Sequence, residues 1–226
     1  RGLFEAVKVA KEVNLDIVHT QTEFSMGLIG KYVARQLGIP AIHTYHTMYE
    51  DYLHYVLNGH LLRPVHVQQF TKSYLKNMDG VIAPSQRVAA LLARYGGEIP
   101  MRVIPTGVDL DAISGPEKAD LREKLGIAPD AQVIITLGRV AAEKKIDRIL
   151  RVMPDLLTEF PKLVFVIAGD GPDADVLKEQ VERLTLEDHV IFAGNIPHDQ
   201  VASYYKMADF FVSASDTETQ GLTYIE

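Results

Sequence analysis

The segment Gln132-Val133-Ile134-Ile135-Thr136-Leu137-Gly138-Arg139 predicts a buried β-strand that ends in a glycine turn. Apolar side chains fall on both faces of this strand, which is typical of a parallel sheet covered by helices. The apolar residues of Ile146–Phe160, which follows the turn, recur with the period of an amphipathic helix. A strand, a turn and a helix in this order predict an α/β fold.

The same alternation of strand and helix patterns extends over the whole chain. In the second half, the expected strands are Gln132–Leu137, Leu163–Ala168, His189–Ala193 and Asp209–Ser213, and the expected helices are Ile146–Phe160, Asp173–Leu184 and Asp199–Met207. In the first half, the expected strands are Asp16–Thr20, Pro40–Tyr45, Gly80–Ala83 and Arg102–Ile104, and the expected helices are Ser25–Leu37, Pro64–Asn77 and Ser85–Tyr95, with Ser85 as an N-cap. Both halves therefore predict a parallel α/β architecture.

A run of turn-forming residues separates the two halves. Both periodicities stop at Pro105-Thr106-Gly107-Val108-Asp109 and at Ser114-Gly115-Pro116. We therefore expect two domains, residues 1–112 and residues 113–226, with a cleft between them. Because ligands of open parallel sheets bind outside the carboxyl ends of the strands, the functional residues are expected in the strand-to-helix loops.

The composition is that of a folded protein, with 47% hydrophobic and 23% charged residues among 226. The formal net charge of −7 disfavours a general nucleic-acid binder, which needs a basic face for phosphates. Because the chain has no cysteine, thiol catalysis, disulfides and thiolate metal sites are excluded. No apolar run approaches the ~20 residues of a membrane span, so we expect a soluble or peripheral protein.

Two glutamates frame a glycine after the last expected strand, in Glu218-Thr219-Gln220-Gly221-Leu222-Thr223-Tyr224-Ile225-Glu226. On spacing alone, such a pair is typical of a solvated helix face. The preceding strand and the central glycine favour a site instead, because a glycine that opens a helix lets a diphosphate approach the backbone amides.

This segment resembles the paired-glutamate motif of the retaining glycosyltransferases of family 4, which have the GT-B fold of two facing, doubly wound, Rossmann-like domains. A second match is Gly138-Arg139-Val140-Ala141-Ala142-Glu143-Lys144-Lys145, which resembles the family's glycine-arginine turn with a lysine downstream. The segments Ala168–Pro172 and Phe192–Ile196 fall in the order that the family has. The resemblance covers nearly the whole chain.

The resemblance implies transfer of a hexose, with glucose expected, from a UDP-sugar with retention of configuration and without an enzymic nucleophile, a cofactor or a metal ion. Arg139 and Lys144 would stabilise the leaving diphosphate, the first as a planar fork and the second as a point charge. Glu218 would face the donor sugar, and Glu226 would accept hydrogen bonds from the ribose. The other implied donor-binding residues are Gly138, Gly169, Gly171, Asn195, Ile196, Thr219, Gln220, Gly221 and Leu222.

Each of these assignments has a simpler alternative. Arginine and lysine normally lie in solvent, and both Gly169-Asp170-Gly171 and Gly194-Asn195-Ile196 are turns that need no ligand. The first of these turns lacks the third glycine of a nicotinamide-binding fingerprint, so an oxidoreductase is the least favoured class. A sugar-nucleotide epimerase of the same fold and a non-catalytic nucleotide-sugar-binding module stay open.

Polar residues also gather at the end of an expected strand in the first half, in His43-Thr44-Tyr45-His46-Thr47. In related lipid glycosyltransferases a histidine that matches His46 lies near the donor sugar and the acceptor, which implies a hydrogen bond to a sugar hydroxyl but no general base. A histidine bonded in the core or rim is the simpler alternative, and it is the one we expect for His19. No third and fourth ligand follow at a zinc spacing, so no metal is expected. The tyrosines that follow would line an acceptor channel or pack: Tyr49, Tyr52 and Tyr55.

The run from His43 to Tyr52 is most similar, within the family, to the bacterial diacylglycerol glucosyltransferases, which implies a membrane lipid as acceptor. The expected helix near residues 64–77 mixes cationic and aromatic residues, as attachment to an anionic lipid surface requires. These residues are Arg63, Phe70, Lys72, Tyr74 and Lys76. A solvated amphipathic face explains the same pattern. The expected location is cytoplasmic, and peripheral attachment to the inner face of the plasma membrane stays open.

Two departures from the family pattern bear on activity. Family members begin with a strand and a glycine-rich loop that contact the donor diphosphate, and nothing before Arg1 supplies them. The segment that crosses back to the first domain would follow Glu226. We therefore expect a fragment without the first strand and the C-terminal helices, and its activity on its own stays open.

Overall fold

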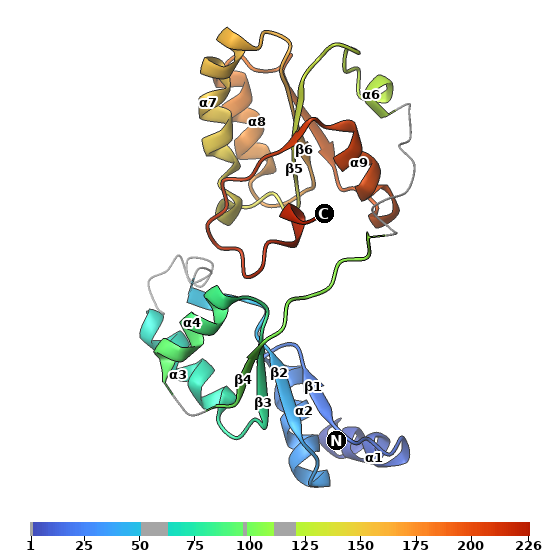
Figure 1. Cartoon of the computed structure of the whole chain (residues 1–226), viewed down its shortest axis with the longest axis vertical. Helices are drawn as coiled ribbons and strands as arrows, with labels where there is room; N and C mark the ends of the chain where they lie inside the picture. Colours follow the sequence, from blue (N-terminus) through green and yellow to red (C-terminus); the bar gives the residue numbers. More distant parts are fainter. Residues whose placement is uncertain (1, 51–62, 97–98, 111–120) are drawn as a thin grey trace. The chain divides into compact units, whose positions relative to one another are not determined.

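The computed structural model describes residues 2–50, 63–96, 99–110 and 121–226 (Figure 1). The chain divides into two compact units: unit 1 consists of Arg1–Thr106 and Glu218–Gln220, and unit 2 of Gly107–Thr217 and Gly221–Glu226. The expected boundary between residues 112 and 113 lies outside the described residues, as do the turn at Ser114–Pro116, Tyr52 and Tyr55. The boundary and the expected cleft therefore stay predictions.

Unit 1 is built on a parallel sheet in the order β1-β2-β3-β4. Its strands are β1 (Val18–Thr20), β2 (Ala41–Thr44), β3 (Gly80–Ala83) and β4 (Met101–Val103). Its helices are α1 (Gly2–Glu12), α2 (Ser25–Leu37), α3 (Pro64–Leu75) and α4 (Gln86–Tyr95). The predicted parallel α/β class is confirmed in this half of the chain.

Helix α4 begins where the sequence places it, because the hydroxyl of Ser85 accepts a hydrogen bond from the backbone N–H of Val88 at 3.3 Å. Its apolar face carries Val88, Leu91 and Leu92 into the core of unit 1. Helix α1, which the sequence analysis did not anticipate, packs against α2 and buries Ala10 (Figure 1).

Unit 2 is built on a second parallel sheet, in the order β7-β6-β5-β8. Its strands are β5 (Val133–Leu137), β6 (Val164–Ala168), β7 (Val190–Gly194) and β8 (Phe210–Phe211). Its α-helices are α6 (Leu121–Lys124), α7 (Ile146–Glu159), α8 (Ala174–Arg183) and α9 (Val201–Met207), and its short 3₁₀ helices are η3 (Ala142–Lys144), η4 (His198–Gln200) and η5 (Leu222–Tyr224).

Both faces of the second sheet are buried. Helices α7 and α8 cover one face and α6 and α9 the other (Figure 1). Along β5, Ile134 packs in the core below α7, whereas Val133 and Ile135 pack in the core below α9. The two-sided apolar pattern that predicted a covered parallel sheet is therefore confirmed.

In the last motif, Gly221 lies immediately before a helical turn. It has a left-handed φ of 73° and precedes η5, a 3₁₀ helix of three residues. The backbone N–H groups of Tyr224 and Ile225 bond the carbonyls three residues before them, at 3.0 and 2.8 Å. The N–H of Glu226 bonds the carbonyl of Leu222, four residues before it, at 3.0 Å. The helix-end charge predicted for this place stays a prediction.

Candidate functional site

The loops that follow β5, β6 and β7 lie at one edge of the second sheet, because the carboxyl ends of parallel strands point the same way. Backbone hydrogen bonds tie these loops together. The N–H of Gly138 donates to the carbonyl of Ala168 at 2.9 Å, and that of Gly169 donates to the carbonyl of Gly194 at 2.8 Å. The predicted donor-site residues that share this edge are Gly138, Arg139, Lys144, Gly169, Gly171, Asn195 and Ile196.

Two of the glycines are needed for the close approach of these loops. A Cβ atom built on Gly169 would lie 1.8 Å from the carbonyl oxygen of Gly138, and one on Gly171 would lie 2.2 Å from that of Val140. The second loop in turn holds the first, because the N–H of Val140 donates to the carbonyl of Asp170 at 3.0 Å. The glycines thus have a packing role, and their predicted contact with a donor stays a prediction.

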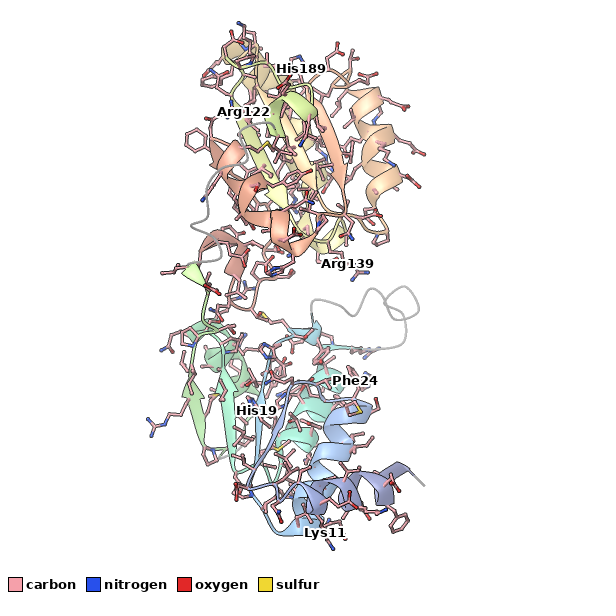
Figure 2. The ribbon with its side chains drawn as sticks, turned by 90° about the vertical axis from the view of Figure 1, so that its right-hand side faces the viewer. Lys11, His19, Phe24, Arg122, Arg139 and His189 are labelled. Carbon is pink, nitrogen blue, oxygen red and sulfur yellow. The ribbon has the colours of Figure 1, made fainter. Side chains whose placement is uncertain are left out.

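The predicted cations lie on the first of these loops. Arg139 is exposed and projects outward from the carboxyl edge of β5 (Figure 2). Lys144 is half-buried at the end of η3. The next residue, Lys145, has a left-handed φ of 51° and forms an ion pair with Asp216, which fastens this loop to the segment after β8. Two cations at a carboxyl edge, Arg139 and Lys144, are suited to a di-anionic ligand.

The predicted ribose ligand, Glu226, is already oriented by another side chain. The Tyr205 hydroxyl on α9 donates to its Oε2 at 3.2 Å. Burial, with the charge of Glu226 as a second cause, raises the pKa of Tyr205, so the phenol stays protonated and keeps donating. Tyr205 also packs edge-on against Phe211 of β8, and Phe211 against Tyr224.

The segment Glu218–Gln220 belongs to unit 1 rather than to unit 2. The Ser85 hydroxyl donates to the carbonyl of Thr219, and Arg87 donates to the carbonyl of Glu218 at 3.4 Å. The side-chain amide of Gln220 pairs with the backbone of Thr106, at 2.8 and 3.0 Å. Of the donor motif, Gly221, Leu222 and Glu226 remain with Arg139 and Lys144 in unit 2. The donor site as a whole therefore stays a prediction.

In unit 1, three exposed polar side chains meet at the carboxyl ends of β1 and β2. His19, at the end of β1 in Figure 2, places Nε2 2.7 Å from the hydroxyl of Thr44. Gln21 lies beside the His19 ring, and its Oε1 accepts a hydrogen bond from Nε2 of His46. Because an amide oxygen only accepts, Nε2 of His46 carries a proton, and in the neutral ring Nδ1 is the acceptor. Burial lowers the pKa of His46, as do His43 and His19 beside it, which favours that neutral form.

Beneath them lies a buried carboxylate that the sequence analysis did not single out. Glu23, 2% exposed, places Oε1 3.1 Å from Nε2 of the buried His43, and its Oε2 accepts the hydroxyl of Tyr49. Glu23 follows the end of β1 by three residues, and nothing in the local sequence marks it as buried. Tyr49 is half-buried and its hydroxyl is bonded to Glu23, and its predicted place in an acceptor channel stays a prediction.

Within 2–50, 63–96, 99–110 and 121–226, no three histidine or carboxylate side chains are grouped so that they could hold a metal ion. None of the helices in those ranges is both long and apolar enough to span a membrane.

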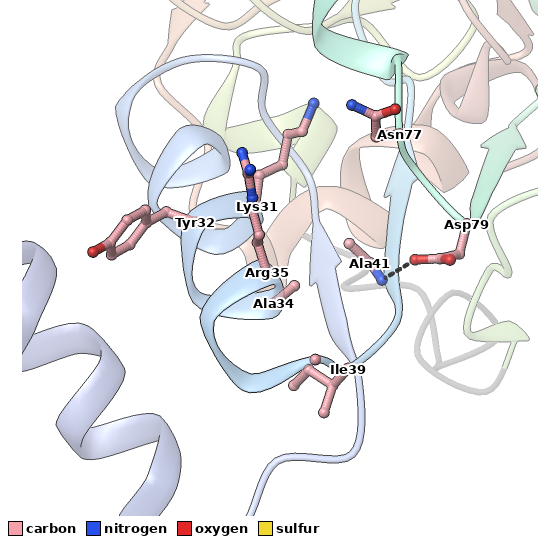
Figure 3. A pocket seen from close by; sticks show the side chains of 9 residues that line it. Lys31, Tyr32, Ala34, Arg35, Ile39, Ala41, Asn77 and Asp79 are labelled. Atoms are coloured by element: carbon pink, nitrogen blue, oxygen red, sulfur yellow. Dashed lines mark hydrogen bonds between the residues drawn. The ribbon is translucent and has the colours of Figure 1, made fainter.

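A hollow of about 660 Å³ lies on unit 1, away from the carboxyl ends of its strands (Figure 3). It is flanked by Ala41, where β2 begins, and by Asp79, just before β3, whose carboxylate accepts from the N–H of Ala41 at 2.7 Å. Lys31 of α2 extends toward Asn77, and Arg35 of the same helix also lines the hollow. Because parallel α/β sheets bind ligands at the opposite edge, this hollow is not a candidate for the site.

Two protein-family models divide the chain between them. The model described as "Glycosyltransferase Family 4" matches residues 1–112, and the one described as "Glycosyl transferases group 1" matches residues 117–226. The chain is 48% identical, over its whole length, to 52% of an alpha-monoglucosyldiacylglycerol synthase of Streptococcus pneumoniae. It is 34% identical, over 97% of its length, to 58% of the synthase of the same name from Acholeplasma laidlawii. The chain thus spans little more than half the length of these relatives.

Solved structures share the arrangement of strands and helices. Sucrose-phosphate synthase from Thermosynechococcus elongatus superposes with a TM-score of 0.78 at 24% identity, over 99% of this chain and 56% of that one. HepE of Anabaena, solved in complex with UDP-glucose, superposes with a TM-score of 0.73 at 21% identity, over 94% and 56%. At these levels of sequence identity, the similarity shows a shared fold and nothing further.

Proposed function

The chain belongs to the family 4 and group 1 glycosyltransferases of the GT-B fold class, and from this premise we propose that the protein transfers glucose from UDP-glucose to a lipid acceptor such as diacylglycerol. The observation that carries the proposal is the 48% identity, along the whole chain, to a relative named for that product. The arrangement of unit 2 supports it, since the exposed Arg139 and the half-buried Lys144 lie at the carboxyl edge of a parallel sheet.

On the donor side, Arg139 and Lys144 would stabilise the charge that develops on the departing UDP. Glu226, held by Tyr205 at 3.2 Å, would accept hydrogen bonds from the ribose. Asn195 and Ile196, at the end of β7, would contact the base, and Gly138, Gly169 and Gly171 would let the diphosphate approach the backbone. Glu218, Thr219, Gln220, Gly221 and Leu222 would complete the site around the donor sugar.

On the acceptor side, His46 would hydrogen-bond a sugar or acceptor hydroxyl through Nδ1, since Nε2 is engaged by Gln21. Transfer with retention requires the acceptor oxygen to attack the face from which UDP leaves, and the departing phosphate would take the acceptor's proton. Alignment of donor carbon and acceptor oxygen then supplies much of the rate enhancement. The reaction needs no enzymic nucleophile in this scheme.

Peripheral attachment to an anionic membrane on the cytoplasmic side is part of the proposal. Arg63, Phe70, Lys72 and Lys76 are exposed on or beside α3, a mixture that suits a lipid headgroup layer. Tyr74 does not contribute, because it is buried and its hydroxyl bonds Thr20 at 3.1 Å. In sedimentation with vesicles of anionic lipid, Lys72→Glu/Lys76→Glu should bind more weakly than Lys8→Glu/Lys11→Glu, which makes the same charge change on α1. Equal binding by both would remove the membrane surface from the proposal.

The transfer itself is tested with radiolabelled UDP-glucose and diacylglycerol in vesicles, using the full-length protein. Arg139→Ala should lower the rate at least ~100-fold, as removal of a charge-stabilising group does in other enzymes. The matched control is Arg151→Ala, since Arg151 is exposed and pairs across a helix turn with Asp147. Glu218→Ala is compared with Glu12→Ala, an exposed glutamate of α1. Wild-type rates in both Arg139→Ala and Glu218→Ala would refute the proposed site. Binding of UDP without transfer would favour a binding module.

A further inference from the structure

The buried carboxylate of Glu23 joins two loops that meet at the carboxyl edge of the first sheet. One oxygen contacts Nε2 of His43, at the middle of β2, at 3.1 Å. The other accepts the hydroxyl of Tyr49, which lies beyond the end of β2. Glu23 itself belongs to the loop between β1 and α2. Both oxygens are therefore used to hold that loop to the residues on either side of His46.

The histidine of this pair is held from its other side as well. Nδ1 of His43 lies 2.8 Å from the hydroxyl of Thr20, which also receives the hydroxyl of Tyr74 at 3.1 Å. The Thr20 hydroxyl has a single proton, for which Nδ1 of His43 and the carbonyl of Ile42, 3.2 Å from the hydroxyl oxygen, are both acceptors. The chain of contacts runs from α3 through β1 and β2 to Glu23, and every side chain in it is buried. Such a network fixes the position of its last member.

The exposed residues Gln21 and His46 belong to the same two loops as the buried network. Gln21 precedes Glu23 by two residues, whereas His46 lies between His43 and Tyr49, the two groups that Glu23 holds. The bond from His46 to Gln21 therefore joins the same two loops that Glu23 joins beneath them. A shift of either loop would break that bond and turn the imidazole.

We propose that Glu23 is a positioning residue for the acceptor side, whose carboxylate fixes the spacing of the two loops and so aims Nδ1 of His46. The effect on catalysis rests on the proposed function. The orientation of the His46 ring does not depend on it. Glu23 does not touch substrate in this scheme and acts through Gln21 and His46.

Tyr49→Phe is the sharpest test, because it removes one hydroxyl and leaves Glu23, His43 and the packing of the ring in place. In the full-length protein, kcat should fall roughly tenfold or more through loss of alignment, while KM for UDP-glucose stays unchanged. In Glu23→Ala, kcat should fall further than in Tyr49→Phe. Glu23→Gln should recover part of the loss, because its amide oxygen still accepts from Tyr49 and a change of tautomer lets His43 accept from its NH₂. The matched control is Tyr32→Phe, a change of the same size on α2 beside the hollow of Figure 3.

A second readout does not depend on activity. In protein labelled with ¹⁵N-histidine, the signal lost in His46→Gln identifies the His46 ring, and its Nε2–H tautomer should dominate in the wild type. Tyr49→Phe should shift that signal toward a mixture of tautomers, whereas Tyr32→Phe should not. If the signal and kcat of Tyr49→Phe both match the wild type, the positioning role of Glu23 is wrong. If the wild type transfers no glucose but its tautomer responds as expected, the proposed function fails and the positioning inference stands.

Discussion

The hydroxyl of Tyr205 lies 3.2 Å from Oε2 of Glu226, and this bond links helix α9 to the segment that follows β8. Tyr205 is itself held by Phe211, whose ring centroid is 5.8 Å away at a steep angle. A carboxylate held by a rigid aromatic residue keeps one rotamer before a ligand arrives. For a residue proposed to bind the ribose, this orientation lowers the entropy lost on binding.

Replacement of Tyr205 by phenylalanine should therefore weaken UDP binding. One hydrogen bond to a charged group is worth roughly 1.5–3 kcal/mol, of which orientation of Glu226 is a part, so a loss of about three- to tenfold in affinity is expected. Isothermal titration with UDP measures it.

The control for this change is Tyr224→Phe, which alters a ring of the same aromatic row without touching the bond to Glu226. An unchanged UDP affinity in Tyr205→Phe would mean that Glu226 does not need this support or does not bind the ribose.

A methyl group added at Gly169, in the loops at the edge of the second sheet, should lower the free energy of unfolding. In Gly169→Ala the new Cβ would meet the carbonyl oxygen of Gly138 at 1.8 Å, at a backbone φ of 140° that L-residues rarely adopt. We expect a loss of about 2–4 kcal/mol in the free energy of unfolding, measured by urea denaturation.

Gly80→Ala provides the comparison, because a Cβ there would meet its nearest atom at an ordinary 3.5 Å. Its unfolding free energy should stay within about 1 kcal/mol of the wild type. Equal losses in the two variants would show that the loops after β5 and β6 can separate without cost.

The strands could be predicted from the sequence because burial on both faces leaves a local pattern. Val133–Leu137 is apolar wherever a covered strand must be, and its predicted limits differ from the observed ones by a single residue. Helix α1 was not predicted, although it carries Glu5 in its first turn, Lys11 in its last and apolar residues at the helical spacing Leu3, Ala6, Val7 and Ala10.

The candidate site was only partly predictable, for a physical reason. Arg139 and Lys144 could be proposed because they follow a strand directly along the chain. Glu23 could not, because its partners His43 and Tyr49 are 20 and 26 residues away and meet it only when β1 and β2 pair. A glutamate in a polar run is ordinarily a solvated residue, and nothing local distinguishes one that the fold will bury.

The buried phenol of Tyr45 should make the stability of the protein depend on pH in the alkaline range. Burial raises its pKa from 10.0 to about 12. Between those values the unfolded chain releases the proton while the folded protein keeps it, so the free energy of unfolding should fall as pH rises from about 10 to about 12. Below pH 10 the contribution is fully present. A pKa difference of about two between the folded and unfolded states corresponds to about 3 kcal/mol of unfolding free energy.

Urea denaturation of Tyr45→Phe at several pH values between about 9 and 12 measures the effect by difference. The variant should lose stability less steeply than the wild type, whereas Tyr224→Phe, at an exposed ring, should follow the wild-type curve. Parallel curves for Tyr45→Phe and the wild type would contradict the assignment.

Lys31 provides the last prediction, since it closes the C-terminal end of α3 from a neighbouring helix. Its ammonium donates to the carbonyls of Tyr74 and Lys76, the second at 3.0 Å, and lies 4.9 Å from the centre of the Tyr74 ring. The last carbonyls of a helix have no partners within it, and a cation there also interacts favourably with the negative end of the helix dipole. Partial burial lowers the pKa of Lys31, which is the cost of bringing the charge to this place.

Lys31→Met keeps the apolar stem and removes the donor, so we expect a loss of about 1–2 kcal/mol in unfolding free energy. Hydrogen exchange should rise at the last turn of α3 in particular. Lys8→Met is the matched control, because Lys8 makes an exposed contact of 3.9 Å with Glu12, which contributes less than about 0.5 kcal/mol. If exchange at the end of α3 is the same in both variants, Lys31 does not cap that helix, and its carbonyls must be satisfied by water instead.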